Sequence, residues 1–193
     1  HRELVEHFIL ADKWGRWLGR WTAEENLHAI ALRDYLVVTR NFDPVADETV
    51  RVAHVMRGYR ADSYSQFETL AFMALYERAH GVFLRNLEAR ITEGVLAELV
   101  GRIAADEERH AEFFHNLVAH CLENHPDQTI GAIVRRAAGL GVVGGDIVEY
   151  QDKLRVIAEA GIFDWDAARG VLSDAIVAWG LTANPQLEKF VRA

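Results

Sequence analysis

Two short Glu-x-x-His motifs in this chain, which we call words, each place an imidazole three residues after a carboxylate. The first runs from Glu25 to His28 and the second from Glu107 to His110. In an α-helix, residues three apart lie on the same face, one turn from each other. Two helices that turn such faces toward each other could hold a pair of metal ions between them. The spacing therefore indicates a metal centre built from carboxylates and histidines.

Both words interrupt apolar seams. Apolar residues recur in steps of three and four between Leu96 and Cys121, and Glu107 and His110 stand where two further core residues belong. The first word has the same position within a seam that runs from Trp14 to Tyr35. A buried carboxylate without compensation costs on the order of several kcal/mol, so such groups are paired, hydrogen-bonded, protonated or bound to metal. Two matched interruptions favour one shared explanation.

Each word also has a simpler interpretation. The residues from Thr22 to Glu25 fit a capping box, in which the Glu25 side chain binds backbone at the start of a helix. The run from Asp106 to His110 fits a solvated charged face with exposed ion pairs. Because the same word recurs at the same core position on two predicted helices, the metal interpretation is favoured.

A di-metal helical bundle also needs carboxylates from further helices. Glu68 and Glu77 lie on the predicted helix between the two words. They are nine residues apart, and at about 100° per residue they fall on opposite faces, so only one can face the site. The intervening residues 70–76 are apolar all round, which predicts a central helix but does not choose between the two glutamates.

Length and composition predict an all-α protein. The 193 residues are 50% hydrophobic and include three prolines, enough to bury a substantial core in long helices. We expect one domain over residues 1–193, with bundle and metal-ligand helices in 1–124 and capping helices in 125–193. Turn and capping signals predict helices near residues 2–18, 22–40, 46–57, 63–91, 93–124, 127–138, 145–160, 165–180 and 184–192.

Charge and cysteine usage narrow the functional class. A net charge of −8 argues against nonspecific nucleic-acid binding. The single cysteine, Cys121, excludes an intramolecular disulfide and favours a reducing cytoplasm. We expect no transmembrane segment and no signal peptide. The chain begins at His1 rather than at Met, which suggests an upstream part.

Beyond these patterns, the two words carry a family resemblance. Residues 21–28, Trp-Thr-Ala-Glu-Glu-Asn-Leu-His, resemble a signature of the soluble acyl-[acyl-carrier-protein] desaturases, and residues 103–110 resemble a second signature. The likeness runs to about residue 120 and looks closest to the mycobacterial branch. It implies a ferritin-like four-helix-bundle core with additional C-terminal helices, two iron ions, and O₂-dependent insertion of a double bond into a carrier-bound acyl chain in fatty acid biosynthesis.

The resemblance also implies roles for individual residues. Residues 76–79 resemble the family's middle helix, so Glu77 is preferred to Glu68 as a ligand. Asp106 is implied to orient a ligating imidazole, and Trp21 to lie near the site or serve as a core anchor. No catalytic residue is implied beyond the metal ligands. The implied ligands are Glu25, His28, Glu77, Glu107 and His110.

The chain departs from the family pattern in two ways. In the family, the sixth ligand precedes a stretch that His1 to Leu4 resemble. We therefore expect this chain to start after the sixth ligand, which would leave the iron centre incomplete. His80 replaces the Thr that usually follows the bridging glutamate by three residues. His80 is interpreted as an added ligand or as a surface residue.

The implied partners are acyl-carrier protein, a ferredoxin-type electron donor and a second copy of the chain in a homodimer. One alternative function is another di-iron oxygenase or a ferroxidase, because these enzymes share the Glu-x-x-His ligand motifs. The other is a non-catalytic desaturase homologue that binds acyl-carrier protein.

Overall fold

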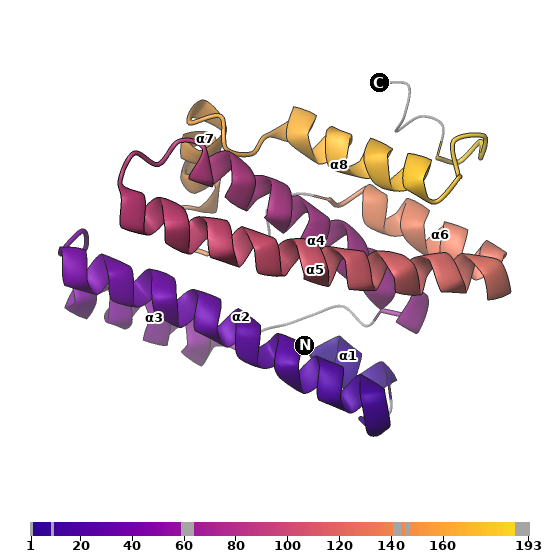
Figure 1. Ribbon diagram of the computed structural model, residues 1–193, viewed down its shortest axis with the longest axis horizontal. Helices are drawn as coiled ribbons and strands as arrows, with labels where there is room; N and C mark the ends of the chain where they lie inside the picture. The colour runs from indigo at the N-terminus through magenta and orange to yellow at the C-terminus, as the bar shows by residue number, and fades with distance from the viewer. Residues whose placement is uncertain (1, 9, 59–63, 141–143, 146, 188–193) are drawn as a thin grey trace. The chain divides into compact units, whose positions relative to one another are not determined.

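The computed structural model describes residues 2–8, 10–58, 64–140, 144–145 and 147–187. Within these ranges the chain forms eight α-helices and no strand, so the predicted all-α class is confirmed (Figure 1). None of the helices in the described part combines the length and the apolarity needed to cross a bilayer.

The helices fall into two compact units. The first unit contains α2 (Asp12–Thr39) and α3 (Pro44–Arg57). The second contains α1 (Arg2–His7), α4 (Gln66–Glu88), α5 (Gly94–Asn124), α6 (Pro126–Ala137), α7 (Tyr150–Glu159) and α8 (Trp165–Ala178). Within the second unit, α6 and α8 pack directly on α4, and the expected division into bundle helices up to residue 124 and capping helices after it stays a prediction. That residues 1–193 form one domain stays a prediction.

The two helices predicted over residues 2–18 and 22–40 are divided differently in the structure. α1 ends at His7, and α2 then runs without a break from Asp12 to Thr39. A Cβ at residue 15 would lie 2.5 Å from the Leu10 carbonyl oxygen, so Gly15 permits the close turn that precedes α2. The Thr22 hydroxyl donates to the Leu18 carbonyl at 2.8 Å in mid-helix. The capping-box interpretation of Thr22 and Glu25 is therefore wrong.

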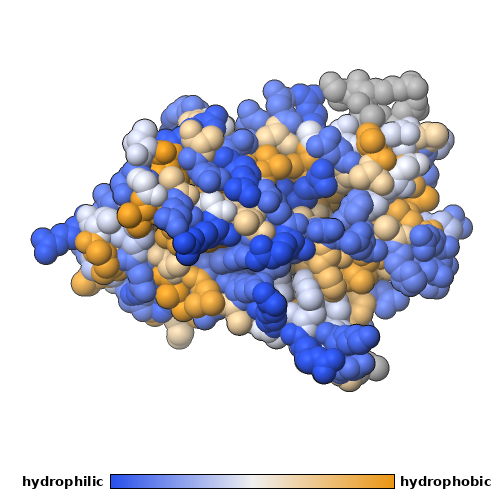
Figure 2. Space-filling view, in the orientation of Figure 1, coloured by the Kyte–Doolittle hydropathy of each residue, from blue (hydrophilic) through white to orange (hydrophobic). Residues whose placement is uncertain are grey.

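α3 starts at a capped turn. The Asp43 carboxylate accepts the N–H groups of Val45 and Ala46, and Pro44 occupies the first helical turn. No α3 residue is buried. Hydrophobic side chains therefore reach the surface among hydrophilic ones, and Figure 2 shows such a mixed surface on its visible face.

α4 and α5 form the centre of the second unit. They are joined by residues 89–93 and pack side by side along their lengths (Figure 1). The predicted central position of α4 is confirmed, because Leu70, Ala71, Met73, Ala74 and Leu75 are all buried. The Glu93 side chain accepts the N–H groups of Val95 and Leu96 and so caps the start of α5.

The apolar seam predicted for α5 is confirmed as far as Phe114. The buried residues of this helix are Val100, Ile103, Ala104, Glu107, His110, Phe114 and Val118. Beyond Phe114 the prediction was wrong, because Val118 is buried where Leu117 was expected and Leu117 is half-buried. A helix with 3.6 residues per turn drifts away from a strict alternation of three and four.

The C-terminal helices cover α4 and α5. α6 packs on both, and α8 packs on α4. The Asn86 amide donates to the Ile162 carbonyl at 2.9 Å, and the Trp179 indole donates to the His115 carbonyl at 3.3 Å. These bonds attach the segments around α8 to the central helices.

Two C-terminal boundaries differ from the prediction. α7 starts at Tyr150 rather than at residue 145, because Gly144 and Glu149 both have positive φ, +116° and +60°, which a helix does not accept. Residues 185–187 form turns rather than the start of a helix over 184–192, and residues 188–192 lie outside the described residues.

Glu68 joins the start of α4 to α6. Its carboxylate accepts the Ser65 N–H at 3.0 Å and a hydrogen bond from Arg135 at 2.8 Å. The Ser65 bond and then the Arg135 bond lower the pKa of Glu68 from 4.5 to about 2. The side chain is 14% exposed, so solvent screens these contacts only in part.

We expect Glu68→Gln to lower the free energy of unfolding at pH 7 by about 1–2 kcal/mol. A lowered pKa in the folded state stabilises the protein above the unfolded pKa and loses that contribution as the pH falls. The difference between wild type and variant should therefore shrink as the pH falls from about 4.5 toward 2. Urea unfolding at several pH values measures it. The exposed Glu98→Gln is the control, and an equal loss in both variants would contradict the prediction.

Candidate metal centre

The first word lies on α2, in the first unit. Leu18, Trp21 and His28 are the buried residues of this helix, and Glu25 is half-buried on the same face. The His28 Nδ1 atom lies 3.9 Å from the Glu25 carboxylate. The Trp21 ring stacks on Trp17 with centroids 6.2 Å apart, one turn before Glu25. α2 therefore carries its carboxylate and imidazole on the face that the seam predicted.

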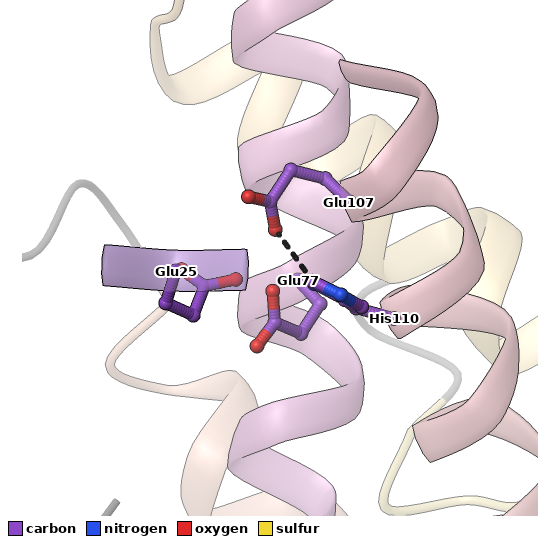
Figure 3. A group of neighbouring side chains, drawn as sticks. All are labelled: Glu25, Glu77, Glu107 and His110. Carbon is purple, nitrogen blue, oxygen red and sulfur yellow. Dashed lines mark ion pairs between the residues drawn. The ribbon is translucent and has the colours of Figure 1, made fainter. Parts of the chain in front are cut away.

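The second unit brings three predicted ligands together. Glu77 on α4 and Glu107 on α5 are both 0% exposed, and His110 is 4% exposed. One potential ligand atom of each of the three lies within 4.8 Å of the others. Figure 3 shows their side chains converging from α4 and α5, with an ion pair of 3.5 Å between Glu107 and His110.

Glu77, and not Glu68, is the α4 glutamate beside Glu107 and His110. Glu68 lies at the first turn of α4, where it completes a capping box with Ser65. Glu77 lies in the middle of the helix among buried residues. The placement agrees with the preference for Glu77, while its role as a ligand stays a prediction.

His80 adds a second imidazole beside Glu107. Its Nδ1 atom lies 3.3 Å from the same Glu107 oxygen, Oε2, that faces His110. In the sequence, His80 stands out as a departure from the family pattern. Its spacing of three from Glu77 repeats the spacing of the two words, and that repetition is the signal that connects it to the site.

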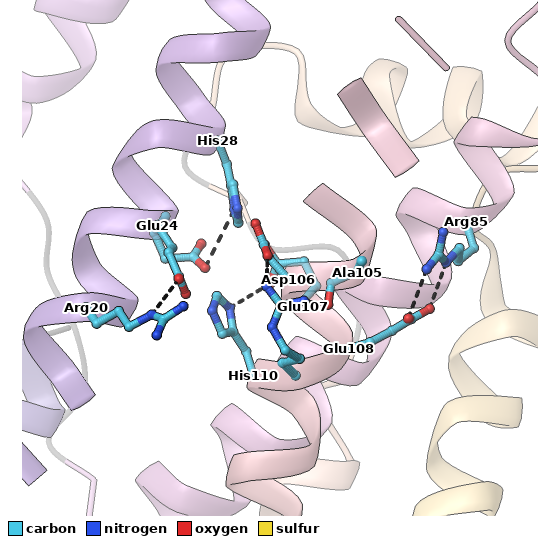
Figure 4. Close-up of polar contacts among 11 residues, drawn as sticks. Arg20, Glu24, His28, Arg85, Ala105, Asp106, Glu107, Glu108 and His110 are labelled. Carbon is cyan, nitrogen blue, oxygen red and sulfur yellow. Dashed lines mark hydrogen bonds and ion pairs between the residues drawn. The ribbon is translucent and has the colours of Figure 1, made fainter. Parts of the chain in front are cut away.

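Glu108, the residue after Glu107, points to solvent. Glu108 is held by Arg85 of α4 through two hydrogen bonds of 2.7 and 2.9 Å (Figure 4). These bonds lower the pKa of Glu108. The solvated-face interpretation is therefore correct for Glu108 and wrong for Glu107 and His110, which face inward.

Asp106 forms an ion pair with Arg109, and Arg109 also donates to the Ala105 carbonyl. The Asp106 side chain is only partly exposed. That Asp106 orients a ligating imidazole, and that Trp21 contributes to the site, stay predictions.

The donor chemistry of the second unit fits a divalent transition-metal ion. Carboxylate oxygen and imidazole nitrogen together suit iron, manganese and zinc. Two carboxylates buried within 4.8 Å of each other repel when both are ionised, and a cation between them removes that repulsion. The residues present therefore fit a metal centre.

Comparison with known proteins places these helices in a family. A family model described as fatty acid desaturase matches residues 6–192. DesA2 of Mycobacterium tuberculosis, assigned as an acyl-[acyl-carrier-protein] desaturase, is 64% identical over 191 residues, 99% of this chain and 70% of the relative. Acyl-[acyl-carrier-protein] desaturase 7 of rice, a chloroplastic protein, is 29% identical over 183 residues, 88% of this chain and 45% of the relative.

A solved structure agrees with the sequence matches. The X-ray structure of DesA2 from Mycobacterium tuberculosis H37Rv matches with a TM-score of 0.84 and 58% identity, covering 92% of this chain and 69% of that chain. The expected likeness to mycobacterial proteins is therefore confirmed. Since the family match extends over all helices that carry the two words, the chain belongs to the fatty acid desaturase family.

Proposed function

We propose that this chain acts as an acyl-[acyl-carrier-protein] desaturase. The reaction removes two hydrogens from adjacent carbons of a carrier-bound saturated acyl chain, and one O₂, two electrons and two protons complete the formation of an alkene and two waters. The observation that supports this proposal is the buried group of Glu77, Glu107 and His110 in a chain of the fatty acid desaturase family.

Two iron ions are the proposed cofactor. Their proposed ligands are Glu25 and His28 of α2, Glu77 of α4, and Glu107 and His110 of α5. When bound, iron supplies the O₂ reduction and the oxidising power that an unactivated acyl chain requires. The protein supplies the donor atoms and the environment around them.

The residues beside Glu107 supply a dry environment. Val100, Ile103, Ala104 and Phe114 are buried on the same helix, within two turns of Glu107. Such packing excludes water, which strengthens the electrostatic attraction between the carboxylates and a cation and limits side reactions of oxidising species.

The partners follow from the same proposal. Acyl-carrier protein delivers the substrate, a ferredoxin-type donor supplies the two electrons, and the chain pairs with a second copy as a homodimer. Cys121 is free and half-buried, and burial raises the pKa of its thiol. A reduced, unreactive thiol of this kind is consistent with the proposed location in the cytoplasm.

Product analysis tests the proposal directly. The protein is loaded anaerobically with Fe(II), mixed with acyl chains on acyl-carrier protein, and exposed to O₂ with reduced ferredoxin. If the five proposed ligands suffice to hold both irons, we expect unsaturated acyl products by mass spectrometry, whereas an incomplete centre should give weak iron binding and no alkene. Oxidation of iron without an alkene would instead indicate a ferroxidase, and binding of acyl-carrier protein without iron would indicate a non-catalytic homologue.

We expect Glu77→Ala to weaken Fe(II) binding by at least about tenfold, because it removes a buried donor and one of the charges that balance the cation. Glu68→Ala should leave iron binding nearly unchanged, because Glu68 caps α4 away from Glu107. Iron per chain after anaerobic loading and desalting measures both. Circular dichroism confirms folding, and equal iron loss in two folded variants would contradict the assignment.

The metal-free protein should tolerate loss of the buried polar pair. Replacing a buried ionic group by apolar residues of similar volume is often neutral or stabilising. We therefore expect Glu107→Leu combined with His110→Leu to leave the melting temperature of the metal-free protein unchanged or to raise it. Differential scanning calorimetry in the presence of a chelator measures this change. A large drop would instead indicate a hydrogen-bond network that stabilises the fold.

A further inference from the structure

His80 gives α4 a carboxylate and an imidazole three residues apart, as α2 and α5 have. We propose that His80 is a metal ligand and that Glu77, His80, Glu107 and His110 together bind one divalent transition-metal ion on α4 and α5. This inference rests on the proposed metal centre and adds to it a donor that the family pattern does not contain.

Two distances to Glu107 fit ligands of one ion, although His80 is not in the group of residues whose ligand atoms all lie within 4.8 Å of one another. The His80 and His110 Nδ1 atoms lie 3.3 and 3.5 Å from the same Glu107 oxygen. Metal–nitrogen and metal–oxygen bonds of about 2.0–2.2 Å place two ligands of a tetrahedral ion about 3.4 Å apart. A direct N–H···O hydrogen bond is shorter, commonly about 2.9–3.0 Å. The spacing therefore suits atoms that face a common ion.

The His80 ring is held in place by its own helix. It stacks on Tyr76 with centroids 5.8 Å apart, and Tyr76 stacks on Phe72 at 5.5 Å. The side chain is 30% exposed overall, but its Nδ1 atom is buried and has no hydrogen-bond partner among the described residues. The exposed edge faces solvent while the buried nitrogen faces Glu107, which is the orientation that a ligand requires.

Charge and topology both support a site of one ion on these two helices. Two carboxylates balance one divalent cation when both imidazoles are neutral. Two oxygen and two nitrogen donors suit Fe(II), Mn(II), Co(II) and Zn(II). α4 and α5 are joined by residues 89–93 and bridged again by Arg85 and Glu108, so one helical hairpin carries all four donors.

A protonated His80 offers the competing explanation. As a cation it would pair with Glu107 and occupy the place of a metal ion. The two explanations predict opposite effects of removing the imidazole. Loss of a ligand weakens metal binding, whereas loss of a competing cation leaves metal binding unchanged or strengthens it.

Co(II) binding to the full chain separates these explanations. Affinity is measured anaerobically by chelator competition, and coordination by the visible absorption of Co(II). We expect His80→Gln to weaken Co(II) binding by at least about tenfold and to change the spectrum. His120→Gln is the matched control, because His120 lies on α5 with a 74% exposed side chain, and it should bind Co(II) like wild type.

The outcomes distinguish this inference from the proposed centre. If Glu107→Gln abolishes Co(II) binding while His80→Gln binds as tightly as wild type or more tightly, His80 is not a ligand and the proposed centre stands. If wild type binds no Co(II), both are overturned.

A second measurement does not depend on the folding of the His80 variant. In a variant that combines Glu25→Gln with His28→Gln, X-ray absorption at one equivalent of Co(II) should show two imidazoles on the ion. One imidazole would overturn the inference.

Discussion

The second unit depends on one constraint, the burial of two carboxylates between neighbouring helices. Glu77 and Glu107 are both fully inaccessible to solvent, and their oxygens lie close to each other. Ionised carboxylates in such a place repel each other and lose their hydration. Hydrogen bonds, protonation or a nearby cation can relieve this, and a metal ion between α4 and α5 would do so for both carboxylates at once.

On α5, burial distinguishes a carboxylate that could bind metal from one that forms an ion pair at the surface. Glu107 and Glu108 are adjacent, but a rotation of about 100° per residue sends one inward and the other to solvent. Glu108 has a guanidinium partner in Arg85, which satisfies its charge and joins α4 to α5. A permanent cation beside Glu107 would instead compete with a metal ion. The arrangement places arginine on the outside and titratable imidazoles on the inside.

The parts of the fold that follow apolar periodicity could be predicted from the sequence. The seam from Val100 to Phe114 is one case, because burial of a helix face is a local pattern. The start of α2 could not, since the contact between Gly15 and the Leu10 backbone is set by a turn that no periodicity records. The angular positions of Glu68 and Glu77 on the helix also could not show which of them faces the site. The local spacing of Ser65 and Glu68, which form a capping box, and the contact from the distant Arg135 of α6 together account for the place of Glu68 at the helix start.

His80 illustrates the limit of motif reading at the site. A family motif states which residue is usual at each position. Judged by the motif alone, a histidine at the position of the usual threonine means only that the threonine is missing. In space the exchange places a nitrogen donor 3.3 Å from a buried carboxylate oxygen. A neutral imidazole adds a donor without adding charge, so it raises the number of protein ligands while the charge balance of the carboxylates stays the same. An ion held by more protein donors would have fewer positions open to water or O₂.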